Sequence, residues 1–304
     1  MTKYYNGREW LFSSINRLPI FKNSATLFSS ILCIRLLNSL TLRTFFQADE
    51  YWQSLEPAHM LVYGYGYLTW EWQQGIRSFS YPLLYSLVYK ICSTLQLPYT
   101  CIIYLPKAVD AIIASIGEYY MYKLAQKLFR KEVLARLTIV LSLLSSFNWY
   151  CSTRSFSNTL ELHLTTIAMY FYANSEIQIS LFLAAFCCLI RPTNAIIWIF
   201  LAIRYISSHN IKHSFQFIKK AIIAGITMVT FDAIVNRWYY GSWKSPLLNF
   251  FQFNVGKGLS SFYGISRPDF YFCQAIPVLL LNFLPAFLYG LFTNESNMAA
   301  LKLL

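Results

Sequence analysis

Long apolar stretches alternate with short polar ones along the whole chain. The apolar runs fall near 24–45, 80–97, 101–122, 133–150, 159–173, 179–206, 221–238 and 271–292. A helix that spans a bilayer needs about 20 mostly apolar residues, so a chain of 304 residues allows roughly seven to nine crossings. The pattern therefore predicts an all-α polytopic membrane protein, and we interpret residues 1–304 as a single transmembrane domain.

One of these runs has a breaker at its centre. The run 179–206 is long for a single span and contains Arg191-Pro192 near its middle. Proline removes a backbone donor and its ring clashes with the preceding turn. The run is therefore either one kinked long helix or two short helices.

Composition supports the membrane assignment. Hydrophobic residues make up 56% of the chain and charged residues 12%, whereas soluble domains carry about 25% charged residues. The net charge of +12 is spread singly among apolar runs and forms no basic stripe, so we expect no nucleic-acid partner. The basic residues instead set the membrane topology, with some left for an anionic ligand.

The basic residues also raise a question of topology. A cluster between Lys123 and Arg136 is expected on the cytosolic side. Two crossings between 80 and 122 would place this cluster on the same side as the acidic segment 46–79. Either one of these runs does not cross the membrane, or the charge rule fails here.

Three segments, 46–79, 151–158 and 239–270, are too polar to cross. The first mixes carboxylates with tyrosines and tryptophans, which is typical of amphipathic helices at a membrane interface. Asp49 and Glu50 stand at its start, directly after the first apolar run. Partial burial would raise their basicity and suit one of them to act as a general base. The alternative is that both are solvated acids at the start of an interfacial helix.

A second group of polar residues lies at the ends of later apolar runs. Arg154 is followed by Asn158 and Glu161, and Arg191 interrupts a later run. A guanidinium group beside hydroxyl and amide groups suits a phosphate or sugar site, because it binds phosphate oxygens in a bidentate manner. The alternatives are a snorkelling arginine at a helix cap for Arg154 and a structural role for Arg191.

Ionisable residues also occur inside the third apolar run, at Lys107, Asp110 and Glu118. Lys107 and Asp110 are three residues apart and could form a pair on one helix face. With Arg191 they could instead form an ion path, which would make the chain a transporter or a non-catalytic membrane protein. The histidines and cysteines show no metal-ligand spacing, so we predict no structural metal site.

Several sequence stretches carry a family resemblance. Residues 46–56 read Phe-Gln-Ala-Asp-Glu-Tyr-Trp-Gln-Ser-Leu-Glu, and residues 65–72 read Tyr-Gly-Tyr-Leu-Thr-Trp-Glu-Trp, followed by Arg77. Further matching stretches lie at 149–154, 157–161, 190–193, 251–255 and 262–264. From about residue 30 to residue 290 the chain resembles glycosyltransferase family 22, the mannosyltransferases of the endoplasmic reticulum.

The resemblance implies a membrane glycosyltransferase fold of the C type, with amphipathic helices in a catalytic lumenal loop at about 46–79. It implies a multi-pass protein of the endoplasmic reticulum membrane that takes mannose from dolichyl phosphate mannose. The acceptor would be the glycosylphosphatidylinositol precursor, which would receive its third, α1,2-linked mannose with inversion. The alternatives within the family are transfer of mannose to the N-glycan precursor and addition of the fourth mannose to the anchor. The donor and acceptor lipids would then be the partners, together with membrane lipids, and the sequence identifies no protein subunit.

The resemblance also implies roles for residues of the loop. Asp49 matches the acidic residue of the family signature, with Glu50 beside it, and would take the proton of the attacking hydroxyl. We infer that cationic groups stabilise the leaving phosphate. The expected substrate-binding residues are Trp70, Glu71, Trp72, Arg77, Arg154, Asn158, Glu161 and Arg191. The two tryptophans would either stack on mannose or anchor the loop in the interface.

The resemblance implies no bound cofactor, because the activated sugar arrives on a lipid, and it does not decide whether a divalent metal ion takes part. Two departures from the family are visible. Gln47-Ala48 stands where many relatives have His-Pro, which favours the third-mannose subgroup. The chain also ends before the family's distal motif containing His, Lys and Glu, which indicates a fragment or a shortened enzyme.

Overall fold

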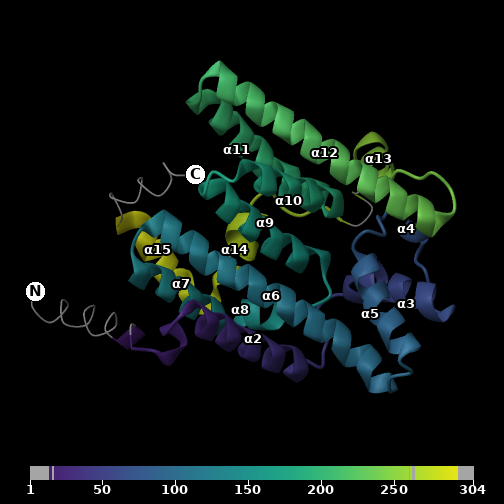
Figure 1. Ribbon diagram of the computed structural model, residues 1–304, viewed down its shortest axis with the longest axis horizontal. Helices are drawn as coiled ribbons and strands as arrows, with labels where there is room; N and C mark the ends of the chain where they lie inside the picture. Colours follow the sequence, from purple (N-terminus) through teal and green to yellow (C-terminus); the bar gives the residue numbers. More distant parts are fainter. Residues whose placement is uncertain (1–13, 16, 260, 262–263, 294–304) are drawn as a thin grey trace, which may run out of the picture.

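The computed structural model describes residues 14, 15, 17–259, 261 and 264–293, and these form helices joined by short loops, with no strand among them (Figure 1). The prediction of an all-α protein is confirmed. The elements of the first half are η1 (Pro19–Phe21), α2 (Ser24–Thr41), η2 (Tyr51–Leu55), α3 (Glu56–Tyr63), α4 (Trp70–Gln73), α5 (Pro82–Thr94), α6 (Tyr99–Phe129), α7 (Glu132–Leu144) and α8 (Ser146–Cys151). Those of the second half are α9 (Ser157–Ala173), α10 (Ile177–Ile190), η3 (Pro192–Asn194), α11 (Ala195–Ser208), α12 (Ile211–Tyr240), α13 (Pro246–Phe251), η4 (Gln252–Gly256), η6 (Tyr271–Ala275), α14 (Ile276–Leu280), η7 (Leu281–Phe283) and α15 (Leu284–Thr293).

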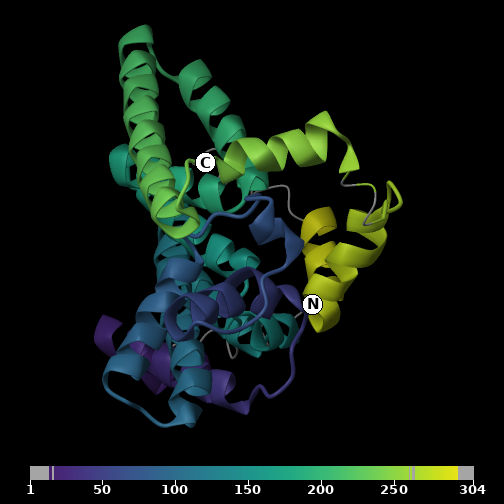
Figure 2. The same ribbon diagram turned by 90° about the vertical axis from the view of Figure 1, so that its right-hand side faces the viewer.

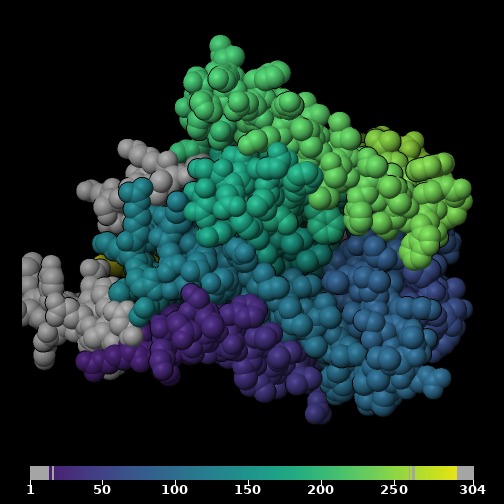
Figure 3. Space-filling view, in the orientation of Figure 1, coloured from purple at the N-terminus to yellow at the C-terminus, as the bar shows by residue number. Residues whose placement is uncertain are grey.

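Within the described residues, three helical segments are long and apolar enough to cross a membrane: Ser24–Thr41, Tyr99–Phe129 and Tyr271–Phe292. Other predicted runs form shorter helices, such as the apolar α10 of 14 residues. The α11–α12 hairpin projects from one side of the body (Figures 2 and 3). The protein is thus a helical membrane protein whose helices differ widely in length.

The α2 and α6 helices pack side by side and run in opposite directions (Figure 1). Leu27 near the start of α2 belongs to the same buried cluster as Tyr122 near the end of α6. At the other end, Lys107 near the start of α6 donates a hydrogen bond to the carbonyl oxygen of Leu42, 2.7 Å away, just after α2. The basic segment after Tyr122 therefore lies at the opposite end of α2 from the acidic loop.

The α5 helix is short and lies beside the acidic loop. It has 13 residues, which corresponds to about 20 Å and is shorter than a hydrocarbon core of about 30 Å. Tyr85 and Tyr89 of α5 pack against Ala58 of α3, so α5 lies with the acidic loop, beside α3 (Figure 1). The run 80–97 thus forms only this short helix, which is not among the described helices long and apolar enough to cross a membrane.

The long run 179–206 forms two helices rather than one kinked helix. The α10 helix ends at Ile190, and Arg191 adopts an extended backbone with φ −139°. A short 3₁₀ turn, η3, precedes α11. Proline has no backbone N–H group to donate inside a helix, but the first position of a helical turn needs none. Pro192 therefore starts η3, and the break falls just before it.

Gly117 of α6 allows a close contact with α9 because it has no side chain. A Cβ atom at Gly117 would lie 2.6 Å from the Cβ and Cγ atoms of His163. We predict that Gly117→Ala lowers the free energy of unfolding by about 1–3 kcal/mol, because the buried His163 ring must move. Gly225→Ala is the matched control, since no heavy atom lies within 4 Å of its added Cβ. Thermal unfolding in detergent should show a lower Tm for the first variant and an equal or higher Tm for the second.

Candidate active site

The acidic loop turns sharply between α2 and η2. The α2 helix ends at Thr41, and the carbonyl oxygen of Ala48 accepts hydrogen bonds from the N–H groups of Tyr51 and Trp52. This turn starts the next helix at Asp49 and Glu50. Adjacent residues at the start of a helix point in different directions, so the two carboxylates enter different surroundings.

Asp49 lines two cavities. The first, here called the cationic cavity, has a volume of about 300 Å³ and includes Arg77, Asn158 and Arg191 in its wall. The second, here called the aromatic cavity, has a volume of about 450 Å³ and includes Trp70 and other aromatic side chains. The two cavities share the residues Asp49, Gln53, Ile76, Arg77 and Phe250. Asp49 therefore lies where they meet.

The Asp49 carboxylate is available for chemistry. It takes part in none of the ion pairs found among the described residues. Partial burial raises the pKa of Asp49 above its ordinary value of 3.8, while the charges of Arg77 and Arg191 act to lower this pKa and the charge of Glu71 to raise it. A partly desolvated carboxylate without a counter-ion in direct contact is suited to accept a proton from a bound hydroxyl.

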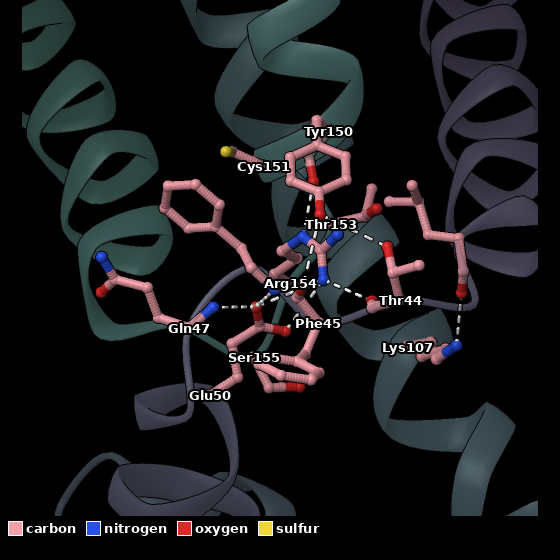
Figure 4. Close-up of polar contacts among 12 residues, drawn as sticks. Thr44, Phe45, Gln47, Glu50, Lys107, Tyr150, Cys151, Thr153, Arg154 and Ser155 are labelled. Atoms are coloured by element: carbon pink, nitrogen blue, oxygen red, sulfur yellow. Dashed lines mark hydrogen bonds and ion pairs between the residues drawn. The ribbon is translucent and has the colours of Figure 1, made fainter. Parts of the chain in front are cut away.

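Glu50 has a different role in the structure. Its side chain is buried and forms an ion pair with Arg154, whose Nη1 lies 3.2 Å from both carboxylate oxygens (Figure 4). The N–H groups of Phe46 and Gln47 also donate to its Oε1 atom, at 2.6 and 3.3 Å. Glu50 thereby fixes the backbone just before Asp49, and lines neither the cationic nor the aromatic cavity.

Arg154 connects the acidic loop to α8. Its Nε donates to the carbonyl oxygen of Tyr150 at 2.6 Å, and its Nη1 donates to that of Thr44 at 2.7 Å. The guanidinium carbon lies 4.2 Å from the centroid of the Tyr150 ring. The sequence-predicted phosphate ligand Arg154 thus joins the acidic loop to α8 and is paired with Glu50.

For the mannose transfer that the family resemblance implies, we predict that Glu50→Gln lowers kcat by about 10-fold and that the rate still falls at acidic pH as in the wild type. The amide still accepts the N–H groups of Phe46 and Gln47 but no longer neutralises Arg154, so the loop shifts while Asp49 remains intact. Initial rates measured from pH 5 to 8 test this. Glu176→Gln, at an exposed position between α9 and α10, is the matched control and should behave as wild type. Loss of the decrease at acidic pH in Glu50→Gln would instead assign the base to Glu50.

Arg191 is brought to the cationic cavity by the break between α10 and α11. Its Nε lies 2.7 Å from Oε2 of Glu161, and its Nη1 donates to Oδ1 of Asn158 at 2.6 Å. Asn194 donates to Glu161 Oε1 at 2.8 Å. The structure therefore brings the predicted residues Asn158, Glu161 and Arg191 together. Asn158 and Arg191 face the cavity, and Glu161 orients Arg191 from outside it.

The predicted residues of the loop differ in exposure. Trp70 lines the aromatic cavity, with its ring 5.1 Å from that of Phe253. Glu71 and Arg77 line the same cavity and form an ion pair at 2.8 Å. Trp72 is only 2% exposed, lines neither cavity and donates from Nε1 to the carbonyl oxygen of Trp52 at 2.8 Å. Its ring belongs to a buried cluster rather than to the surface of the site.

The predicted pairing of Lys107 with Asp110 is wrong. Asp110 accepts hydrogen bonds from the hydroxyl groups of Tyr85 and Ser155, both at 2.6 Å. Lys107 donates to the Leu42 carbonyl oxygen instead. Each side chain thus bonds to a residue of another element. Arg191 lies in the wall of the cationic cavity, which neither Lys107 nor Asp110 lines.

Sequence reasoning missed Gln53, which lines both cavities and whose hydrogen bond lowers the pKa of Asp49. The interfacial helix was expected to begin after Glu50, but it already includes Asp49, and a spacing of four residues then places Gln53 on the same helix face as Asp49. Phe250 lies one residue before the predicted stretch 251–255. Phe262 and Tyr263, part of the predicted stretch 262–264, lie outside the described residues.

The fold and the site define a class: a helical membrane protein with a carboxylate that lies at the junction of a cationic and an aromatic cavity and forms no ion pair in the described part of the chain. The chain belongs to the Alg9-like mannosyltransferase family, whose model matches residues 26–304. No solved structure matches it.

Curated relatives agree with this membership. The chain is 46% identical over 284 residues to GPI mannosyltransferase 3 of Debaryomyces hansenii, covering 90% of this chain and 51% of the relative. It is 43% identical to GPI mannosyltransferase 3 of Candida albicans, covering 90% and 56%. It is 34% identical to GPI alpha-1,2-mannosyltransferase 3 of Homo sapiens, covering 95% and 52%. The chain spans about half the length of these relatives.

Proposed function

We propose that this protein is a mannosyltransferase of the endoplasmic reticulum membrane that acts on the glycosylphosphatidylinositol precursor. It transfers mannose from dolichyl phosphate mannose and adds the third mannose through an α1,2 linkage. The names of the relatives from Debaryomyces hansenii and Homo sapiens support the acceptor and the linkage. The observation that carries the proposal is the position of Asp49, a carboxylate without an ion pair among the described residues, where two cavities of different chemistry meet.

The reaction is a single displacement with inversion. The acceptor hydroxyl oxygen forms a bond to the anomeric carbon of mannose while the bond from that carbon to the phosphate oxygen breaks, and dolichyl phosphate leaves. Asp49 takes the proton of the hydroxyl group, in the manner of the base of inverting glycosidases. The phosphate is a good leaving group, so the chemistry requires no general acid.

The two cavities divide the substrates by charge. Arg77 and Arg191 line the cationic cavity and would stabilise the charge that develops on the leaving phosphate. Trp70 lines the aromatic cavity and would stack on a sugar of the acceptor, beside the carboxylate of Glu71. Arg154 and Glu50 would hold the loop, and Trp72 would support it from the core.

The proposal includes no cofactor. Dolichyl phosphate mannose lacks the diphosphate that usually calls for a divalent cation, and the arginines supply positive charge at the cationic cavity. We predict that EDTA leaves the rate of mannose transfer unchanged. A requirement for added Mg²⁺ or Mn²⁺ would contradict this prediction.

Transfer of radiolabelled mannose by the purified chain in detergent tests the function. The acceptor is a glycosylphosphatidylinositol precursor with two mannoses, and the expected product gains one mannose that an α1,2-mannosidase removes. A parallel test expresses the chain in cells that lack each family 22 mannosyltransferase in turn. Rescue of only the third-mannose defect supports the proposal, and rescue of an N-glycan precursor defect or of the fourth-mannose defect would overturn it.

A further inference from the structure

A third cavity, separate from the one that holds Asp49 with Arg191, lies between the end of α2 and the start of α6. Its volume is about 480 Å³, and its wall includes Arg43, Lys107 and Arg154. Neither Asp49 nor Arg191 lines it. We call it the α2–α6 cavity.

The charge balance of this cavity is uneven. Its wall has two carboxylates, Glu50 and Glu56. Glu50 is paired with Arg154, and Glu56, which accepts the N–H group of Tyr67 at 2.8 Å, keeps its negative charge, so three cations face two carboxylates in the wall. Among the described residues neither Lys107 nor Arg43 forms an ion pair.

Lys107 is the most informative of these cations. It lies within α6, one of the helices long enough to cross the membrane, and its ammonium group donates to the Leu42 carbonyl oxygen (Figure 4). Lys107 lies near the start of α6 beside the acidic loop, partly buried and without an ion-pair partner among the described residues. A neutral carbonyl oxygen does not compensate the charge, so the position favours an anion in the cavity.

Arg154 provides a second, independent observation. Its residue is buried, and its Nη2 atom has no hydrogen-bond partner among the described residues, while Nε and Nη1 are both engaged. A buried donor without an acceptor is destabilising. Figure 4 shows Arg154 and Lys107 with Thr44 between them. A ligand with several acceptor oxygens could satisfy donors from both sides.

The remaining wall is apolar. Leu42, Leu55, Ile102 and Ile103 line the cavity. Ile103 is 42% exposed on α6, a helix long and apolar enough to cross a membrane, so the cavity borders an apolar surface of that helix. An anionic head against cations with an alkyl chain against apolar side chains is the pattern of a lipid phosphate.

We propose that the α2–α6 cavity binds the phosphate group of a membrane lipid, with Lys107, Arg43 and Arg154 around the phosphate and the chain of the lipid leaving between α2 and α6. The phosphate is carried either by a polyprenol, as a monoester, or by a glycerolipid, as a diester. The inference goes beyond transfer at Asp49, because it concerns binding in a different cavity.

Binding of radiolabelled lipids to the purified chain in detergent tests this site without turnover. The lipids are dolichyl phosphate and phosphatidylinositol, with dolichol and inorganic phosphate as comparisons. Tight binding of dolichyl phosphate alone that Lys107→Gln weakens identifies the monoester as the ligand of this cavity, and tight binding of phosphatidylinositol that Lys107→Gln weakens identifies the diester. Dolichol binding as tightly as dolichyl phosphate, or inorganic phosphate as tightly as either phospholipid, would overturn the site.

Substitutions connect the binding to the cavity. Lys107→Gln is expected to weaken binding about 10-fold, whereas Lys90→Gln, at an exposed position on α5, should leave it unchanged. Arg43→Gln is expected to weaken binding about threefold, and because Arg43 is exposed this variant does not depend on the folding of α6. Equal affinity of Lys107→Gln, Arg43→Gln and wild type would refute the proposal. Asp49→Asn should keep full binding, which separates this result from any failure of transfer.

Discussion

Asp49→Asn is expected to lower the rate of mannose transfer by about 10²–10⁴-fold, the usual contribution of a general base. The amide has nearly the same shape as the carboxylate but cannot accept the proton of the acceptor hydroxyl. Asp49 forms no ion pair among the described residues, so its substitution leaves no buried partner uncompensated. The chain should therefore fold and express as wild type. Initial rates with radiolabelled dolichyl phosphate mannose, together with thermal unfolding, measure both properties.

The pH dependence gives the same residue a second test. The base acts when it is ionised, so kcat/KM should fall as the pH drops through the pKa of Asp49, which partial burial raises above 3.8. The residual activity of Asp49→Asn should not show this decrease at acidic pH. Asp269→Asn, which alters an exposed carboxylate paired with Arg267, is the control and should retain the full rate and profile. A fully active Asp49→Asn variant would remove Asp49 from the mechanism.

Arg35→Met is expected to have the largest effect on stability, lowering the free energy of unfolding by about 3–5 kcal/mol. Arg35 is fully buried in α2 and donates from Nε to Glu118 Oε2 of α6 at 2.9 Å. Its Nη1 also donates to Asn38. Without the guanidinium group Glu118 keeps one neutral donor, the hydroxyl of Ser142 at 2.9 Å, beside its buried charge. The contact between two membrane-spanning helices would then carry an uncompensated carboxylate.

Thermal unfolding of the purified chain in detergent measures this loss. Arg267→Met breaks an exposed ion pair with Asp269 and should change the stability by less than about 1 kcal/mol. The double substitution Arg35→Met with Glu118→Met should recover much of the stability, because it removes both buried charges. A Tm of Arg35→Met within 1 °C of the Arg267→Met control would contradict the buried pair as a main connection between α2 and α6.

The sequence alone determined the broad features of this protein. Apolar runs separated by polar segments predict membrane helices, because lipid and water partition side chains by polarity over lengths set by the bilayer. Proline at 192 predicts either a kink or a break, and the structure shows a break between α10 and α11. The acidic and aromatic stretch after the first run indicates the site, and its resemblance to family 22 is confirmed by the family model.

Tertiary structure decided which of two neighbouring acids is free. Asp49 and Glu50 are adjacent and chemically alike, so no local pattern separates them. The difference comes from Arg154, which lies 104 residues after Glu50 and neutralises it. The same applies to Trp70 and Trp72: the first lines a cavity, and the second packs against Phe79 and Tyr239 in the core.

The way the run 80–97 folds was also decided by packing. The run 80–97 reads as apolar, yet α5 is short and packs beside α3, which leaves α2 and α6 as antiparallel neighbours. Lys107 and Asp110 share a helix face, yet each has found a partner from another element. The spacing of residues along a helix indicates which side chains can come into contact. Which of them form depends on side chains that only the folded chain brings within a few ångströms, because hydrogen bonds and ion pairs act over such short distances.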